Sequence, residues 1–201
     1  KVIVAMSGGV DSSVAAVKLK KEGYNVVGIT LRLYNHINSS KSKSCCAGID
    51  IADAKKISKQ YDFPHHTLDY QDKFYDGVIT NFIESYANGE TPVPCIQCNQ
   101  TVKFSDLLNE SKNLNADALV TGHYAIRKGG LNKSKLFKAK DRKKDQSYFL
   151  FATLQDQLDY VRFPLGDYFK SEIRKMANKF DLVVSDKPDS QDICFVTSDS
   201  Y

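Results

Sequence analysis

The stretch KVIVAMSGGVDSSVAAVKLKK, residues 1–21, decides the fold. Its apolar run at residues 2–5 predicts a buried strand, and residues 12–22 carry apolar side chains at helical spacing. Between them, Gly8 and Gly9 allow the backbone to take positive φ and to pass close to a ligand. A strand, a glycine turn and a helix in this order predict the first unit of an α/β domain.

The same alternation continues along the next hundred residues. Further strands are expected at residues 25–34, 64–68 and 117–124, and further helices at residues 49–61, 74–87 and 102–114. This order predicts a parallel twisted sheet with helices on both faces. Ligands bind at the carboxyl ends of the strands in such folds, so the turns after Ala5 and Val120 would share one ligand-binding edge.

After residue 125 the pattern changes. Gly129 and Gly130 stand between short alternating flanks that predict a hairpin, and a helix is expected at residues 170–179. We therefore expect a core domain over residues 1–125. Residues 126–201 would form a basic insertion and the rest of the same domain, with a small C-terminal extension. Because the chain stops within ICFVTSDSY, further domains are expected to follow it.

Composition limits the class of protein. The 201 residues are 42% hydrophobic and 26% charged, as in ordinary globular domains. No run approaches the roughly 18 apolar residues of a membrane span, and the N-terminus is too quickly polar for a signal peptide. Five cysteines, including the adjacent Cys45 and Cys46, do not suit a secreted disulfide framework. We expect an intracellular protein, and leave open whether Cys45 and Cys46 are buried hydrophobes.

Charge is concentrated in one segment. The net charge is only +4, yet residues 127–144, RKGGLNKSKLFKAKDRKK, hold nine Lys or Arg and a single acid. One basic segment on a mildly acidic body predicts contact with a polyanion. A solvated, charged hairpin is the alternative.

The glycine turn has the chemistry of a phosphate site. Backbone N–H groups at a helix N-terminus attract anions, and Ser7, Ser12 and Ser13 add hydroxyl donors. The turn lacks the lysine of a Walker loop and the spacing of dinucleotide folds. Asp11 is compatible with phosphate if Mg²⁺ lies between them. These features predict a pyrophosphate grip that splits ATP into AMP and pyrophosphate.

The full run S-G-G-V-D-S-S at a strand–helix junction resembles the loop of the ATP pyrophosphatase family. Its members, such as GMP synthetase, NAD synthetase and several tRNA-thiolating enzymes, adenylate a carbonyl-type oxygen and then displace AMP. The resemblance implies an ATP site made by Ala5, Met6, Ser7, Gly8, Gly9, Val10, Asp11 and Ser12.

A second motif is PVPCIQCNQ, residues 92–100, in which Cys95 and Cys98 have C-x-x-C spacing. Such a pair can hold a metal, form a redox disulfide or present one nucleophilic thiol. Together with TGHY (121–124), KDQSYFL (144–150) and DSQDICF (189–195), it resembles the tRNA-specific 2-thiouridylases over essentially the whole chain. These enzymes replace the 2-oxygen of the wobble uridine in certain tRNAs with sulfur, and their catalytic domain is adenine nucleotide hydrolase-like.

The resemblance assigns roles. Cys194 would accept sulfur as a persulfide from a donor protein, and Cys98 would be the second catalytic cysteine. A Cys98–Cys194 disulfide would form and be reopened by a reductant. Leu31 and Gly122 would join the ATP site. The tRNA contacts would be Lys144, Asp145 and Gln146.

It also implies a setting. The partners would be the tRNAs for Glu, Gln and Lys, and no membrane is involved. The compartment would be bacterial cytoplasm rather than an organelle matrix. Lys103 and Lys144 are candidate cations for stabilising the thiolates.

Several alternatives stay open. Many relatives have aspartate where this chain has Cys95, so Cys95, Cys98 and Cys194 could instead hold an iron–sulfur cluster. A structural zinc is a further possibility, although no histidine lies at ligand spacing from the cysteine pair. The chain could also be a GMP synthetase-like enzyme, or a nucleic-acid-binding or sulfur-carrier module.

Three histidines are also considered as site residues, and Leu31 has a second, structural interpretation. His65 and His66 in a short strand are expected to be one buried and one exposed. His123 would lie at the strand edge that faces the nucleotide. Leu31 could be ordinary core rather than an adenine contact.

Overall fold

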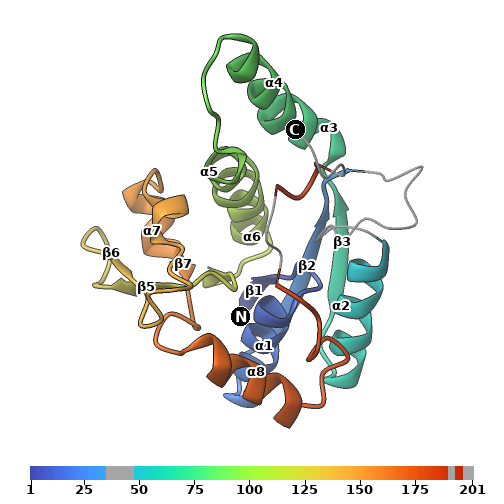
Figure 1. Ribbon diagram of the computed structural model, residues 1–201. Coiled ribbons are helices and arrows are strands. Elements are labelled where there is room, and N and C mark those ends of the chain that lie inside the picture. The colour runs from blue at the N-terminus through green and yellow to red at the C-terminus, as the bar shows by residue number, and fades with distance from the viewer. Residues whose placement is uncertain (35–47, 190–192, 197–201) are drawn as a thin grey trace.

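The computed structural model describes residues 1–34, 48–189 and 193–196 (Figure 1). Its centre is a five-stranded sheet of order β3-β2-β1-β4-β7, in which all neighbouring strands are parallel. The strands are β1 (Val2–Ala5), β2 (Val26–Arg32), β3 (His65–Asp69), β4 (Ala118–Val120) and β7 (Val161–Arg162). The Cys45–Cys46 pair lies outside the described residues.

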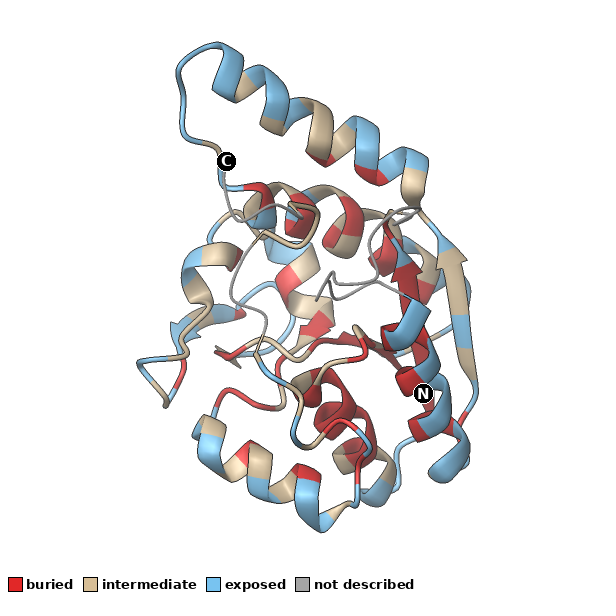
Figure 2. Cartoon of the chain, turned by 45° about the vertical axis from the view of Figure 1, so that its right-hand side comes forward, coloured by how far each residue is buried: buried red, intermediate tan, exposed pale blue. Residues whose placement is uncertain are grey.

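Helices cover both faces of this sheet, as predicted (Figures 1 and 2). Val2 and Val4 of β1 pack on one face with helices α1 (Val10–Lys21), α2 (Gly48–Gln60) and α8 (Lys170–Lys179). Ile3, which points the other way, belongs to the apolar cluster of the opposite face. A strand buried on both faces is apolar at every position, which explains the uninterrupted run at the start of the chain.

Two helical segments on the second face are interrupted by π-helical turns. The first runs through α3 (Gln71–Phe74), η1 (Tyr75–Ile79) and α4 (Thr80–Ala87). The second runs through α5 (Pro94–Cys98), η2 (Asn99–Leu107) and α6 (Leu108–Asn113). The helix expected at residues 102–114 therefore begins earlier than predicted, and the C-x-x-C pair lies on it. Such π turns are frequent at functional sites.

The region after residue 125 contains the predicted hairpin. Strands β5 (Ala125–Lys128) and β6 (Lys135–Lys138) pair antiparallel, and Gly129 takes φ +108° at their turn. Helix α8 has the predicted bounds. Not predicted were the 3₁₀ helix η3 (Ser147–Leu150), helix α7 (Gln155–Tyr160) and β7, because elements this short show no periodicity. In the part of the chain that the structure describes, no helix combines the length and apolarity that crossing a bilayer requires.

Gly166 provides a test of this packing. A Cβ placed on Gly166 would lie 1.9 Å from the carbonyl oxygen of Ala125 at the start of β5. Gly166→Ala should therefore lower the free energy of unfolding by about 1–3 kcal/mol, as overpacking does. The measurement is urea denaturation. Gly130→Ala is the matched control, because its Cβ would meet nothing within 4 Å. Equal unfolding midpoints for the two variants would contradict the packing described here.

Candidate active site at the switch point of the sheet

The loop between β1 and α1 lies where the strand order reverses. From β1 the chain first adds β2 and β3 on one side of the sheet, and then adds β4 on the other. The crevice at the carboxyl ends of such strands is the usual ligand site of open α/β sheets. The predicted ATP loop therefore lies at the position where folds of this type usually bind their ligand.

Two glycines let the backbone pass closely here. Gly8 has φ +73°, and a Cβ on it would lie 2.3 Å from the carbonyl oxygen of Asp50 in α2. A Cβ on Gly122, which follows β4, would lie 2.8 Å from the amide nitrogen of Ser12. The two suspected turns therefore meet at one edge, as predicted, and Gly122 packs against the first turn of α1.

The serines of the loop form hydrogen bonds with one another and with the loop backbone. The Ser7 amide donates to Ser12 Oγ at 3.1 Å, and the two hydroxyl oxygens lie 3.2 Å apart. Ser13 is fully buried, and its hydroxyl donates to the Gly9 carbonyl at 2.7 Å. The Ser13 hydroxyl therefore serves the loop itself, and not a ligand as the sequence suggested.

Asp11 is held by two residues from distant parts of the chain. The ammonium of Lys170, at the start of α8, lies 2.7 Å from both carboxylate oxygens of Asp11. The Tyr124 hydroxyl donates to Asp11 Oδ1 at 2.7 Å. Burial and the neighbouring Asp11 carboxylate raise the pKa of Tyr124, so its phenol keeps the proton that it donates.

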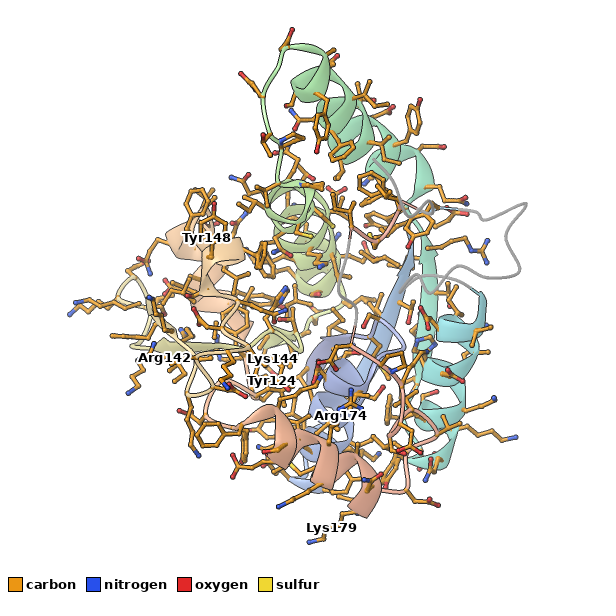
Figure 3. All side chains as sticks on the ribbon, viewed as in Figure 1. Tyr124, Arg142, Lys144, Tyr148, Arg174 and Lys179 are labelled. Atoms are coloured by element: carbon orange, nitrogen blue, oxygen red, sulfur yellow. The ribbon has the colours of Figure 1, made fainter. Side chains whose placement is uncertain are left out.

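Asp189, from the DSQDICF motif, gathers three cations. Lys144 and Arg174 each lie 2.7 Å from its carboxylate, and Lys170 lies 2.9 Å from it. Partial burial favours the neutral acid, but the hydrogen bonds from Lys144 and Lys170 outweigh it and lower the pKa of Asp189. The carboxylate is therefore ionised at neutral pH. Figure 3 labels Lys144, which lies in the loop after β6, and Arg174, which lies on α8.

Lys187 joins the same C-terminal segment to the glycine turn. Its ammonium donates to the Gly8 carbonyl at 2.9 Å and to the carboxylates of Asp50 and Asp53 in α2. Burial disfavours the charged lysine, but the two carboxylates outweigh this and raise its pKa. Lys187 thus joins the backbone of Gly8 to the start of α2.

The residues predicted to contact tRNA make internal contacts. Lys144 pairs with Asp189, as described above. Asp145 accepts hydrogen bonds from the Ala139 amide at 2.7 Å and the Ser147 hydroxyl at 2.8 Å. Gln146 Oε1 accepts from the Tyr124 amide at 2.9 Å.

The two predicted catalytic cysteines meet on one apolar cluster. Cys98 is buried in it, and Cys194 and Phe195 pack against it. The Phe195 ring makes edge contacts with Phe74 and Phe82, at 5.7 and 5.2 Å between centroids. The fold thus unites segments that lie far apart in sequence.

The backbone of Cys194 is hydrogen-bonded to a residue that lines a cavity. The Tyr34 hydroxyl donates to its carbonyl oxygen at 2.6 Å. Tyr34 lines a shallow cavity of about 220 Å³ together with Leu33, Gln71, Asp72, Tyr75 and Ile79. The segment of Cys194 is therefore linked through Tyr34 to this cavity after β2.

The three cysteines that the structure describes, Cys95, Cys98 and Cys194, do not make a metal site. Cys95 is exposed on α5 whereas Cys98 is buried. Within residues 1–34, 48–189 and 193–196, no three His, Cys, Asp or Glu side chains gather so that they could hold a metal ion. The iron–sulfur and zinc alternatives do not fit this arrangement.

The remaining predicted residues are in or near the core. Leu31 is buried in the same apolar cluster as Cys98. His65 is half-buried and His66 exposed, close to expectation. Burial lowers the pKa of His65 to about 4 and that of His123, with help from the Lys103 charge, to about 3. His123 is therefore neutral near pH 7, and its Nδ1 lies 2.8 Å from the Thr121 hydroxyl.

A family model described as the tRNA methyl transferase HUP domain matches residues 1–198. The chain belongs to this family. It is 60% identical over all 201 residues to the tRNA-specific 2-thiouridylase MnmA of Orientia tsutsugamushi (strain Boryong). It is 56% identical over 200 residues to the MnmA of Rickettsia bellii (strain OSU 85-389). The predicted resemblance is confirmed, and the chain spans about half of these relatives, 54% of each.

Solved structures support the HUP-domain fold. An NMN synthetase from Francisella tularensis aligns with a TM-score of 0.56 and 18% identity, over 94% of this chain and 66% of its own. A predicted subunit of a tRNA methyltransferase from Methanocaldococcus jannaschii aligns with a TM-score of 0.53 and 23% identity. That alignment covers 88% of this chain and 73% of the other.

Sequence reasoning missed three residues of this HUP-domain site, namely Lys170, Arg174 and Lys187. All are lysines or arginines far along the chain from the loop, and two lie on an ordinary amphipathic helix. The one usable signal was the charged run SDKPD, residues 185–189, directly before the cysteine motif.

Lys187 supplies a stability test. Lys187→Met would leave the carboxylates of Asp50 and Asp53, which are 7% and 12% exposed, without their shared cation. We expect the free energy of unfolding to fall by about 1–3 kcal/mol, between the values for surface and buried ion pairs. Urea denaturation measures the change. The control Lys179→Met removes an exposed lysine from α8 and should change stability by less than about 0.5 kcal/mol. Equal losses would argue against the Lys187 bridge.

Proposed function

We propose that this chain carries the catalytic machinery of a tRNA-uridine 2-sulfurtransferase. The observation that carries the proposal is its 60% identity, over the whole chain, to a tRNA-specific 2-thiouridylase. The glycine loop at the switch point and the two cysteines on one apolar cluster support it. The substrates are ATP and tRNAs such as those for Glu, Gln and Lys, in the bacterial cytoplasm.

The first step is adenylation. The 2-oxygen of the wobble uridine attacks the α-phosphorus of ATP, and the bond to the bridging oxygen breaks so that pyrophosphate leaves. Backbone amides at the start of α1 bind the phosphates. Asp11 would hold Mg²⁺, which proteins commonly bind through one or two carboxylates and substrate phosphates, and the ion neutralises the leaving group. Lys170, released by Asp11, stays close through Asp189 and can pair with phosphate.

The second step is sulfur transfer. A donor protein leaves a persulfide on Cys194, whose terminal sulfur attacks the adenylated carbon and expels AMP. The Cys98 thiolate then attacks Sγ of Cys194, so the base keeps the sulfur and a Cys98–Cys194 disulfide forms. Alternatively, Cys98 first releases hydrosulfide from the persulfide, which forms the same disulfide. A thiol reductant restores both thiols.

Adenylation is tested with Asp11→Ala in the full-length protein. Because Lys170 keeps Asp189 as a partner, the fold should survive while tRNA-dependent pyrophosphate release from ATP is lost. Pyrophosphate is measured with and without unmodified tRNA. Asp167→Ala, an exposed aspartate of the same domain, should behave as wild type.

Each contrary result has a meaning. Pyrophosphate release by Asp11→Ala at the wild-type rate would refute the role of Asp11. Wild-type release that needs no tRNA and is stimulated by another nucleotide or an amide donor would favour a GMP synthetase-like enzyme. Binding of tRNA without any pyrophosphate release would favour a binding or carrier module.

Sulfur transfer is tested with serine substitutions. Cys98→Ser and Cys194→Ser should each keep pyrophosphate release but lose thiouridine, measured by mass spectrometry of digested tRNA. Cys194→Ser should also lose the protein persulfide. Cys95→Ser is the matched control, because Cys95 is exposed and outside the apolar cluster, and should largely keep activity. Normal thiolation by either of the first two variants would exclude this mechanism.

A further inference from the structure

Two aromatic side chains stand exposed directly after the KDQ residues. Tyr148 and Phe151 are 64% and 68% exposed, and their ring centroids lie 6.3 Å apart with a 45° tilt. Figure 3 shows Tyr148 pointing away from the ribbon, on the side of the molecule that also carries Arg142. Single exposed apolar residues are common, but two large rings side by side on one short turn are less so. We call Tyr148 and Phe151 the aromatic pair.

The turn that carries the aromatic pair is held in place by its polar neighbours. Asp145 binds the Ala139 amide next to β6, and Gln146 binds the backbone of Tyr124. The buried Asn99, next to Cys98, donates its amide to the Phe149 carbonyl at 3.0 Å. The carboxylate of Asp145, Oε1 of Gln146 and the side-chain amide group of Asn99 are engaged within the protein, whereas the rings of Tyr148 and Phe151 stand exposed.

The surroundings of the pair are cationic. Strand β6 contacts η3, and the hairpin and the loop after it expose a series of cations. They include Lys133, Lys135, Lys138, Arg142 and Lys143. Aromatic rings beside a positively charged surface match unpaired nucleotides, whose bases stack and whose phosphates pair with lysine and arginine. An apolar protein partner would not need this charge.

We propose that the aromatic pair is a stacking platform for unpaired bases of the RNA substrate. The proposal rests on the function proposed above, since it assumes that tRNA is the substrate. It assigns the base contact to Tyr148 and Phe151. Asp145 and Gln146 position the turn, and the exposed cations of the hairpin bind phosphate.

The experiment uses the full-length protein and measures binding of unmodified tRNA by fluorescence anisotropy over a series of salt concentrations. Stacking is worth a factor of roughly ten per base, so Tyr148→Ala with Phe151→Ala should weaken tRNA binding at least about tenfold. The slope of log affinity against log salt should not change, because the lysines and arginines that neutralise phosphates are all still present. Reversing the charge of Lys133, Lys135 and Lys138 should instead flatten that slope, by about 0.7–0.9 for each phosphate that the protein no longer neutralises.

Controls separate the outcomes. Tyr148→Phe with Phe151→Tyr keeps both rings and should restore affinity. Tyr24→Ala removes an exposed ring that lies just before β2, at the amino end of that strand, and should have no effect. Duplex RNA without unpaired bases should bind the double alanine variant as it binds wild type.

Three results would overturn the proposal. They are wild-type tRNA affinity in the double alanine variant, an equal loss of affinity for duplex RNA, and a loss of persulfide transfer from the donor protein at unchanged tRNA affinity. The last would make the pair a protein-docking surface. If the wild-type protein itself binds no tRNA, the proposed function fails rather than this inference alone.

Discussion

The ammonium of Lys170 lies between two carboxylates, and much of the site depends on it. It joins Asp11 in the first turn of α1 to Asp189 in the C-terminal segment, from the first residue of α8. Its side chain is only 12% exposed, so both charges must be compensated within the protein. The glycine loop is thereby tied to the region that leads to Cys194. Lys187 makes a second tie, from the same region to the Gly8 carbonyl.

Under the proposed function, this network is the binding site of an anionic substrate. Three cations, Lys144, Lys170 and Arg174, meet the two carboxylates of Asp11 and Asp189, whereas the neighbouring Lys187 meets the carboxylates of Asp50 and Asp53. A Walker loop carries its lysine within the loop, whereas here the cation comes from a helix far along the chain. The ion pair keeps Lys170 in position before substrate arrives. A phosphate group can then replace Asp11 as the partner of Lys170, and Mg²⁺ can replace Lys170 as the partner of Asp11.

Local sequence patterns predicted the elements whose structure is determined by residues close together in the sequence. The strand at VIVA was predictable from its unbroken apolar run, the turn from its two glycines, and the helix at residues 170–179 from its amphipathic period. The π turns were not, since apolar spacing does not distinguish i→i+5 from i→i+4 hydrogen bonds. The two residues of β7 form a strand only because β4 is beside them. Lys170 and Lys187 acquire their roles through contacts across more than 130 residues, which no local pattern contains.

The position of the aromatic pair relative to the cysteines follows from one buried amide. Asn99 is adjacent to Cys98 on the helix, and its side chain binds the carbonyl of Phe149, between Tyr148 and Phe151. Because the amide is 3% exposed, losing this bond would leave a buried polar group unsatisfied, so the two segments are held together. Under the proposal, an RNA base stacked on the pair would lie at a fixed offset from Cys98. The turn, which Asn99, Asp145 and Gln146 hold in place, would then set the register of that base.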